Sequence, residues 1–174
     1  MNQNDLGTVF SLIKYEGLLY GINRLSLTDQ FWKQLKQFNF INEAFSSPFN
    51  SRLFCVPEDM RFCSIYDKSD LQKNYVGDFF KIDFTQYSGN WIIFPPTVEK
   101  IVIKTLEFVG EKYNKNEFNA TAIIIVPKWD HLDLINIFKE NIPHELIAKN
   151  SIDLLMHDGR KIKKNDVDDE FSRN

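Results

Sequence analysis

The stretch Gly89-Asn90-Trp91-Ile92-Ile93-Phe94-Pro95-Pro96-Thr97 decides the fold of this chain. The mostly apolar segment Asn90 to Phe94 is typical of a short buried strand. Pro95-Pro96 ends this strand, because proline has no backbone N–H to donate to a sheet ladder. In the segment that follows, 98–113, apolar residues recur at the i, i+3 and i+4 spacing of an amphipathic helix. The sequence therefore predicts a strand, a rigid turn and a helix in direct succession.

Helix and strand patterns also alternate on both sides of this stretch. Helices are predicted over 7–20, from a cap at Ser26 or Thr28 to 38, and over 132–139; strands over 40–45, 120–126, 144–148 and 152–156; and a further extended piece over 79–84. The run 120–126 is apolar on both sides, as in a central strand of a parallel sheet. This alternation predicts an α/β fold with right-handed crossovers.

Three turns follow strands in this arrangement. They are Ser46-Ser47-Pro48, Phe94-Pro95-Pro96-Thr97 and Pro127-Lys128-Trp129-Asp130. In an open parallel sheet the ligand crevice lies beyond the carboxyl ends of the strands. We therefore expect the functional site at these three turns.

The bulk composition indicates one ordinary globular domain. The chain has 174 residues, of which 43% are hydrophobic and 26% charged. We expect a single domain over 1–159, with a helical N-terminal part over 7–38 and a polar tail over 160–174. The net charge of −3 argues against a strongly basic nucleic-acid surface.

Cysteine and histidine usage predicts neither a disulfide framework nor a metal site. Cys55 and Cys63 lie outside any C-x-x-C spacing, and three histidines are spread along the chain. The N-terminus has no basic region followed by an apolar core, and no apolar run reaches the length of a membrane span. We expect an intracellular protein, nuclear or cytoplasmic, without metal or membrane contact.

Four short motifs occur in an order that resembles a known family. They are Glu43-Ala44-Phe45-Ser46-Ser47-Pro48-Phe49-Asn50, Phe62-Cys63-Ser64, Phe94-Pro95-Pro96-Thr97 and Val126-Pro127-Lys128-Trp129. Over roughly 25–160 the chain resembles the catalytic domain of the phosphorylated-CTD-interacting-factor family, the cap-adjacent adenosine N6-methyltransferases. The resemblance implies a Rossmann-like, S-adenosylmethionine-dependent methyltransferase fold, with a mostly parallel central sheet and flanking helices.

The resemblance also implies roles for individual residues. Ser46, Ser47, Pro48 and Asn50 would line the S-adenosylmethionine side; Phe94, Pro95, Pro96 and Thr97 would occupy the catalytic tetrapeptide; Trp129 and Asp130 would lie near the substrate or the donor rim. The residues themselves also allow plainer roles. Ser46 and Ser47 would cap a turn, and Trp129 would pack on the edge of the sheet.

The catalytic tetrapeptide departs from the family pattern at both outer positions. In the family a polar residue precedes the two prolines and orients the substrate amine, and an aromatic residue follows them and stacks on the base. Phe94 cannot accept a hydrogen bond, and Thr97 cannot stack. Only the backbone carbonyls and the rigidity of the prolines are kept.

Three hypotheses about function follow. The first is a degenerate, non-catalytic subunit that binds RNA, DNA or a partner, with a catalytic methyltransferase subunit as the heterodimer partner. The second is an active S-adenosylmethionine-dependent adenine N6-methyltransferase with a variant motif. The third is a pure protein-interaction module on a methyltransferase fold. Whether the donor is bound stays open under the first hypothesis.

Overall fold

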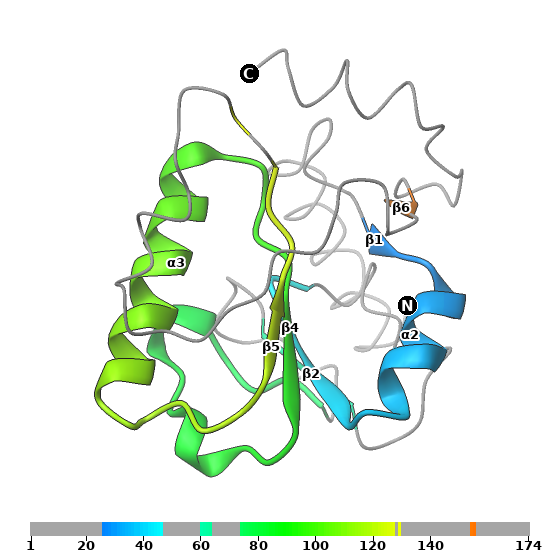
Figure 1. The fold of residues 1–174 in the computed structure, drawn as a ribbon, viewed down its shortest axis with the longest axis horizontal. Helices are drawn as coiled ribbons and strands as arrows, with labels where there is room; N and C mark the ends of the chain where they lie inside the picture. Colours follow the sequence, from blue (N-terminus) through cyan, green and yellow to red (C-terminus); the bar gives the residue numbers. More distant parts are fainter. Residues whose placement is uncertain (1–25, 47–59, 64–73, 128, 130–153, 156–174) are drawn as a thin grey trace, which may run out of the picture.

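The computed structural model describes residues 26–46, 60–63, 74–127, 129 and 154–155 (Figure 1). Its elements are β1 (Ser26–Leu27), α2 (Asp29–Lys36), β2 (Phe40–Ala44), β3 (Arg61–Phe62), the 3-10 turns η3 (Phe79–Lys81) and η4 (Phe84–Gln86), β4 (Asn90–Ile93), α3 (Glu99–Asn114), β5 (Ala122–Ile124) and β6 (Leu154–Leu155). Among these, β1 and β6 form a separate antiparallel pair.

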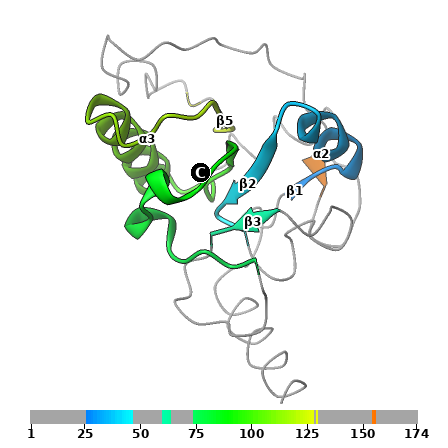
Figure 2. The same ribbon diagram turned by 90° about the horizontal axis from the view of Figure 1, so that it is seen from below.

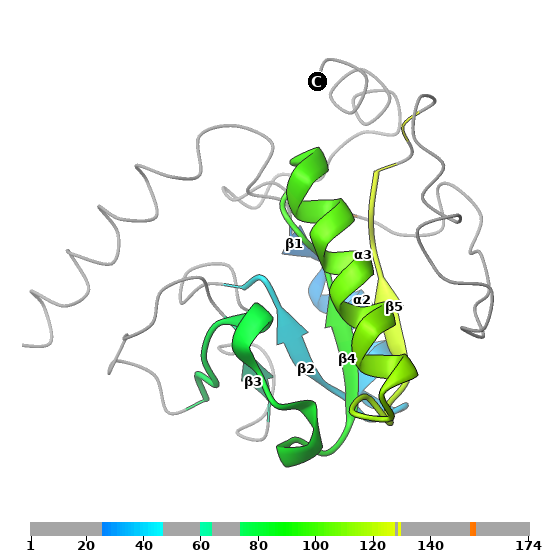
Figure 3. The same ribbon diagram turned by 90° about the vertical axis from the view of Figure 1, so that its left-hand side faces the viewer.

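The main sheet has four parallel strands in the order β3-β2-β4-β5. Ala44 of β2 pairs with Ile93 of β4, and Ile93 pairs with Ile124 of β5. Figure 3 shows these strands running in one direction beside α3. The expected α/β fold with a mostly parallel sheet is therefore confirmed for the described residues.

The side chains of β4 alternate between the two faces of the sheet. Trp91 and Ile93 point to one face of the sheet and Ile92 to the other, and all three are buried. Gly89 precedes them with φ +90°, and a Cβ at this position would meet the Ile41 side chain at 2.5 Å. A residue with a side chain could not enter β4 along this path without moving Ile41.

Helices α2 and α3 cover opposite faces of the sheet (Figure 2). Helix α2 is capped by Thr28, whose hydroxyl accepts a hydrogen bond from the Phe31 backbone N–H at 3.2 Å. Its buried residues Trp32 and Leu35 belong to what we call the α2-side cluster. The whole cluster consists of Leu27, Trp32, Leu35, Phe40, Ile41, Met60 and Ile92. Of the two predicted caps, Thr28 is the one the structure uses.

The α3 side of the sheet is packed mainly by aromatic rings. The cluster there contains Ala44, Cys63, Phe79, Ile82, Phe84, Trp91, Ile93, Val109 and Phe118. Phe84 contacts Trp91 and Phe118 edge to face, with ring centroids 5.0 and 4.7 Å apart. This aromatic layer joins η3 and η4 to β4 and α3.

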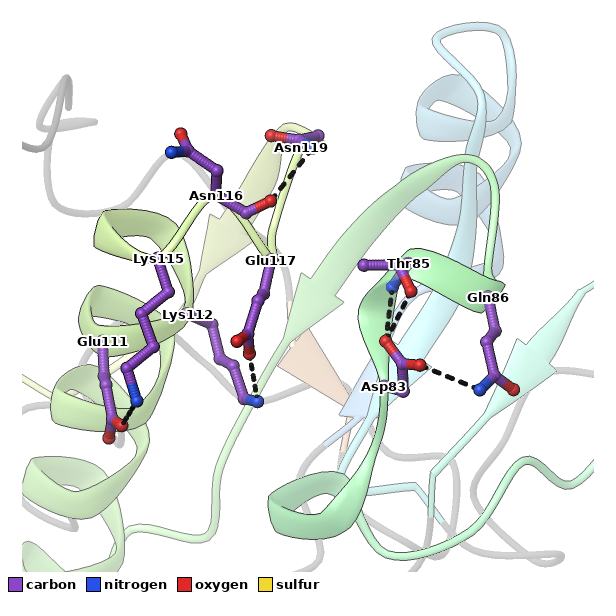
Figure 4. A network of polar contacts seen from close by, with 9 residues as sticks. All are labelled: Asp83, Thr85, Gln86, Glu111, Lys112, Lys115, Asn116, Glu117 and Asn119. Carbon is purple, nitrogen blue, oxygen red and sulfur yellow. Dashed lines mark hydrogen bonds and ion pairs between the residues drawn. The ribbon is translucent and has the colours of Figure 1, made fainter.

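Polar contacts gather at the turns that lead into β4 and β5, which form the amino edge of the sheet (Figure 4). The Asp83 carboxylate accepts hydrogen bonds from the Thr85 hydroxyl at 2.6 Å and from the Gln86 amide at 2.8 Å, and both lower the pKa of Asp83. The Lys112 ammonium pairs with Glu117 at 2.6 Å. These contacts stabilise the turns at the amino edge. The candidate site lies at the opposite edge of the sheet.

One sequence-based expectation is wrong and a second is confirmed in part. The segment 79–84 was expected to be extended, but it forms η3 and the start of η4, because Asp78 and Asp83 each accept a backbone N–H two residues on. The run 120–126 was expected to be a central strand. A strand is confirmed there as β5, which pairs with β4 and has half-buried side chains. Its central place stays a prediction, because the strand predicted over 144–148 lies outside the described residues.

Several other predictions fall outside the described residues. They are the helices over 7–20 and 132–139, the strand over 144–148 and the tail over 160–174. The helix predicted over 98–113 is confirmed as α3, and the strands over 40–45 and 90–94 are confirmed as β2 and β4. The strand over 152–156 is confirmed in part as β6.

Candidate functional site

The carboxyl ends of β2, β4 and β5 lie side by side at one edge of the sheet. Their register places Ala44, Ile93 and Ile124 in one row, and the Ile125 backbone N–H donates to the Ile93 carbonyl at 2.9 Å. The residues that follow each strand therefore meet at this edge. They belong to the three turns at which the sequence predicts the functional site.

The order of the strands identifies one position along this edge as special. From β2 the chain passes to β3 on one side, and it then returns to place β4 on the other side of β2. The connections that leave β2 and β4 thus diverge, and the space between the two strand ends is a topological switch point. In open α/β sheets ligands bind in the crevice outside such a point.

We call the region outside the ends of β2 and β4 the crevice, as the place where strand order predicts a ligand. The end of β2 bounds its first side. Phe45 follows the strand with φ +60°, in the left-handed region that bulky residues rarely adopt. The buried Ser46 comes next, and its backbone N–H donates to the Cys63 carbonyl at 2.9 Å. Of the four predicted donor-binding residues, Ser46 is described and lies at the crevice, whereas Ser47, Pro48 and Asn50 lie outside the described residues.

The second wall is the turn after β4. The Phe94 ring continues the alternation of β4 and packs against the α2-side cluster, as Ile123 and Ile125 of the neighbouring segment also do. Pro95 and Thr97 are buried and Pro96 is half-buried. The Val98 backbone N–H donates to the Pro96 carbonyl at 2.7 Å, which closes a tight turn before α3. All four residues of the tetrapeptide thus lie at the crevice.

The turn after β5 packs its aromatic residue against α3. Trp129 is buried and packs with Val102 and Leu106 of α3, next to Ile124 and Val126. Asp130 lies outside the described residues. The role of Trp129 and Asp130 as substrate contacts stays a prediction.

Cys63 lies beside the crevice but is unsuited to nucleophilic chemistry. Its thiol is free and fully buried, and burial raises its pKa far above the ordinary value of 9.0. The Asp78 and Glu43 carboxylates raise this pKa further, because they repel a thiolate. The thiol therefore stays protonated at physiological pH.

Residues that ligate metals do not gather in the described part of the chain. No group of three or more His, Cys, Asp or Glu residues there could hold a metal ion. Nor is any helix of that part long and apolar enough to span a membrane.

Two features of the crevice were missed by sequence reasoning. Glu43 is a buried charged residue in β2, one position before the end of the strand, and a charged residue inside the strand Phe-Ile-Asn-Glu-Ala was a visible signal. The left-handed backbone of Phe45 had no such signal, because phenylalanine does not favour it.

One family model matches this chain. It is described as the phosphorylated CTD interacting factor 1 WW domain, and it matches residues 8–142. The match includes every element from α2 to β5, and so both described walls of the crevice. Neither a curated protein nor a solved structure shows a match to the chain.

Proposed function

Because the chain belongs to the phosphorylated CTD interacting factor 1 family, we propose that it is a methyltransferase-like protein that has lost catalysis and acts by binding. In this proposal the sheet is the core of a Rossmann-like methyltransferase fold. The order β3-β2-β4-β5, with its switch point between β2 and β4, supports that assignment. The crevice is then the place where S-adenosylmethionine and an adenine would meet.

The position of Phe94 is the observation on which the loss of catalysis rests. Amine methylation needs a hydrogen-bonding group at this position to orient the nitrogen in line with the methyl group. The Phe94 side chain has no such atom, and its ring is packed into the apolar face of the sheet. A small movement of the turn would not bring a hydrogen-bonding side chain to this position.

The position after the prolines supports the same conclusion. Thr97 is buried and stands where the family pattern has an aromatic residue that stacks on the base. A base entering the crevice would therefore meet neither the polar group nor the stacking ring. The two losses act on different parts of the substrate, so reversing one would not restore the other.

The partner we propose is a protein. The family is described by its interaction with a phosphorylated CTD, which points to a phosphorylated protein partner and to a nuclear location. A catalytic methyltransferase subunit, joined as a heterodimer, would supply the chemistry that the tetrapeptide lacks. Within the pair, this chain would contribute to the binding of RNA or DNA.

A catalytically active enzyme is the second candidate, and one observation favours it. Pro95 is fully buried and the Pro96 carbonyl is fixed by its hydrogen bond with Val98, so the backbone of the turn is held rigidly. Backbone carbonyls held in this way would orient an amine without a side chain. Under this alternative the chain binds S-adenosylmethionine and methylates adenine by itself.

Calorimetry and a methylation assay separate these functions. The purified chain is titrated with S-adenosylmethionine and with capped RNA, and is then incubated with tritiated donor and either capped RNA or adenine-containing DNA. We expect binding of donor or RNA without methyl transfer. Transfer by the chain alone would establish the active enzyme. Absence of both donor and nucleic-acid binding would leave a pure protein-interaction module.

A further inference from the structure

Phe45 combines a strained backbone with a fixed ring at the switch point. Its φ of +60° lies in the left-handed region, which a residue with a large side chain occupies only when its surroundings hold it there. Its ring is held by two others, with centroids 4.8 Å from Phe79 and 5.5 Å from Phe80. The strained residue is therefore anchored by aromatic packing on the α3 side.

The anchor acts on the main chain that forms the first wall of the crevice. Phe45 directly precedes Ser46, whose N–H donates to the Cys63 carbonyl, and the Cys63 N–H donates to the Glu43 carbonyl at 2.8 Å. These two hydrogen bonds join the ends of β2 and β3 around the left-handed residue. If φ of Phe45 relaxed to an ordinary value, the chain direction at Ser46 would change and the first bond would break.

We infer that Phe45 is a positioning residue: its ring, packed on Phe79 and Phe80, holds β2 in the left-handed exit that places Ser46 at the ligand crevice. The inference deepens the proposed function, because it rests on this crevice as the donor site. Phe45 itself need not touch the ligand. It determines where the backbone groups that follow it are presented.

Substitutions at Phe45 distinguish the effect of its ring from the effect of its left-handed backbone. Phe45→Tyr keeps the ring and should behave as the wild type. Phe45→Ala removes the ring and leaves the left-handed cost of a Cβ, so the exit should relax. Phe45→Gly also removes the ring but adopts the left-handed region freely. The Ser46 amide should be best protected from exchange with Phe or Tyr at position 45, less protected with Gly, and least protected with Ala. Ordinary strand propensity predicts Gly below Ala.

Native-state hydrogen exchange followed by nuclear magnetic resonance measures this order. The Ser46 amide is compared with the Ile125 amide, which is bonded to the Ile93 carbonyl at the same edge of the sheet. In Phe45→Ala the exchange rate of Ser46 relative to Ile125 should rise at least about tenfold, whereas Phe45→Gly should show a smaller rise. Phe118→Ala, which removes a buried ring from the same aromatic cluster, should leave the ratio unchanged.

An unchanged ratio in Phe45→Ala, or a Gly variant that exchanges as fast as the Ala variant, would overturn the inference. A titration of the same proteins with S-adenosylmethionine tests the proposed function separately. We expect donor affinity to fall in Phe45→Ala and to persist in Phe118→Ala. If the wild type binds no donor, the donor site is wrong, and the exchange order still decides the role of Phe45.

Discussion

Phe94 shows how one residue changes what a turn can do. It stands directly before Pro95, at the end of a strand whose side chains alternate between two buried faces. A polar side chain here would point into the same apolar cluster and would need its own hydrogen-bond partner. An aromatic ring removes this requirement and adds packing. Phenylalanine at this position therefore favours stability.

Replacing Phe94 with Asn should therefore destabilise the protein. We expect the free energy of unfolding to fall by about 1–3 kcal/mol, because an amide replaces a packed ring against the α2-side cluster. Urea denaturation measures the change. The matched control is Phe38→Asn, since Phe38 is 67% exposed. A loss equal to that of the control would show that the Phe94 ring is not packed.

The buried thiol of Cys63 predicts a pH effect on stability at alkaline pH. The folded thiol has a raised pKa, so only the unfolded chain loses this proton as the pH passes the ordinary value of 9.0. The stability is fully present below pH 9.0 and falls above it, by at most about 1.4 kcal/mol per pH unit. Urea denaturation of the wild type and of Cys63→Ala between pH 8 and 10 measures the difference. A difference between the two proteins that does not vary with pH would contradict the burial of this thiol.

At the scale of elements, local signals were enough for β4 and α3 but not for the segment between β3 and β4. Proline chemistry and helical spacing are read within a few residues, so Pro95-Pro96 and α3 could be predicted. In 79–84 the apolar residues suggested an extended strand. The aspartates before each turn decided otherwise, since Asp78 and Asp83 bond the backbone locally and favour 3-10 turns.

The Asn90 side chain links the start of β4 to the residues that precede β2 and β5 at the amino edge. Its removal should therefore lower the stability of the protein. Its side-chain amide donates to the Phe38 carbonyl at 2.8 Å, and its Oδ1 accepts from the Thr121 N–H at 3.0 Å. Asn90→Ala should lower the free energy of unfolding by about 1–2 kcal/mol. Asn119→Ala, which removes one exposed bond to the Asn116 carbonyl, is the control. Equal effects measured by urea denaturation would exclude a bridging role for Asn90.

Ile93 and Ile124 differ in burial, so a charge should have different effects at these two positions. Ile93 is fully buried in a central strand, whereas Ile124 is half-buried in the last strand of the described order. Ile93→Asp should cost about 4 kcal/mol or more and leave the domain largely unfolded. Ile124→Asp should cost clearly less. Circular dichroism and urea denaturation compare the two variants, and the reverse ranking would contradict the strand order.

At the scale of the molecule, the sequence predicted which turns lie at the carboxyl edge of the sheet but not how they are arranged. The motifs could be placed at carboxyl strand ends, because a parallel sheet puts these ends on one edge. The switch point between β2 and β4 depends on strand order, which arises from contacts distant in sequence. The burial of Trp129 against α3 and the left-handed Phe45 depend on the same packing.

The two edges of the sheet differ in the residues that they carry. Charged and amide groups at the amino edge hold the turns that lead into β4 and β5 (Figure 4). The carboxyl edge holds the crevice, whose described walls carry the buried Ser46 and the apolar Phe94. Directly before Pro95 this edge carries an apolar ring and no hydrogen-bonding side chain.

Methyl transfer by the isolated chain tests this central claim most directly. The protein is held in excess over capped RNA or adenine-containing DNA with tritiated S-adenosylmethionine, so that even one turnover would be counted. An active adenine N6-methyltransferase serves as the positive control. We expect incorporation no greater than that of a heat-denatured sample. Tritium in N6-methyladenine above this background, lost when Pro95 is replaced by Ala, would contradict it.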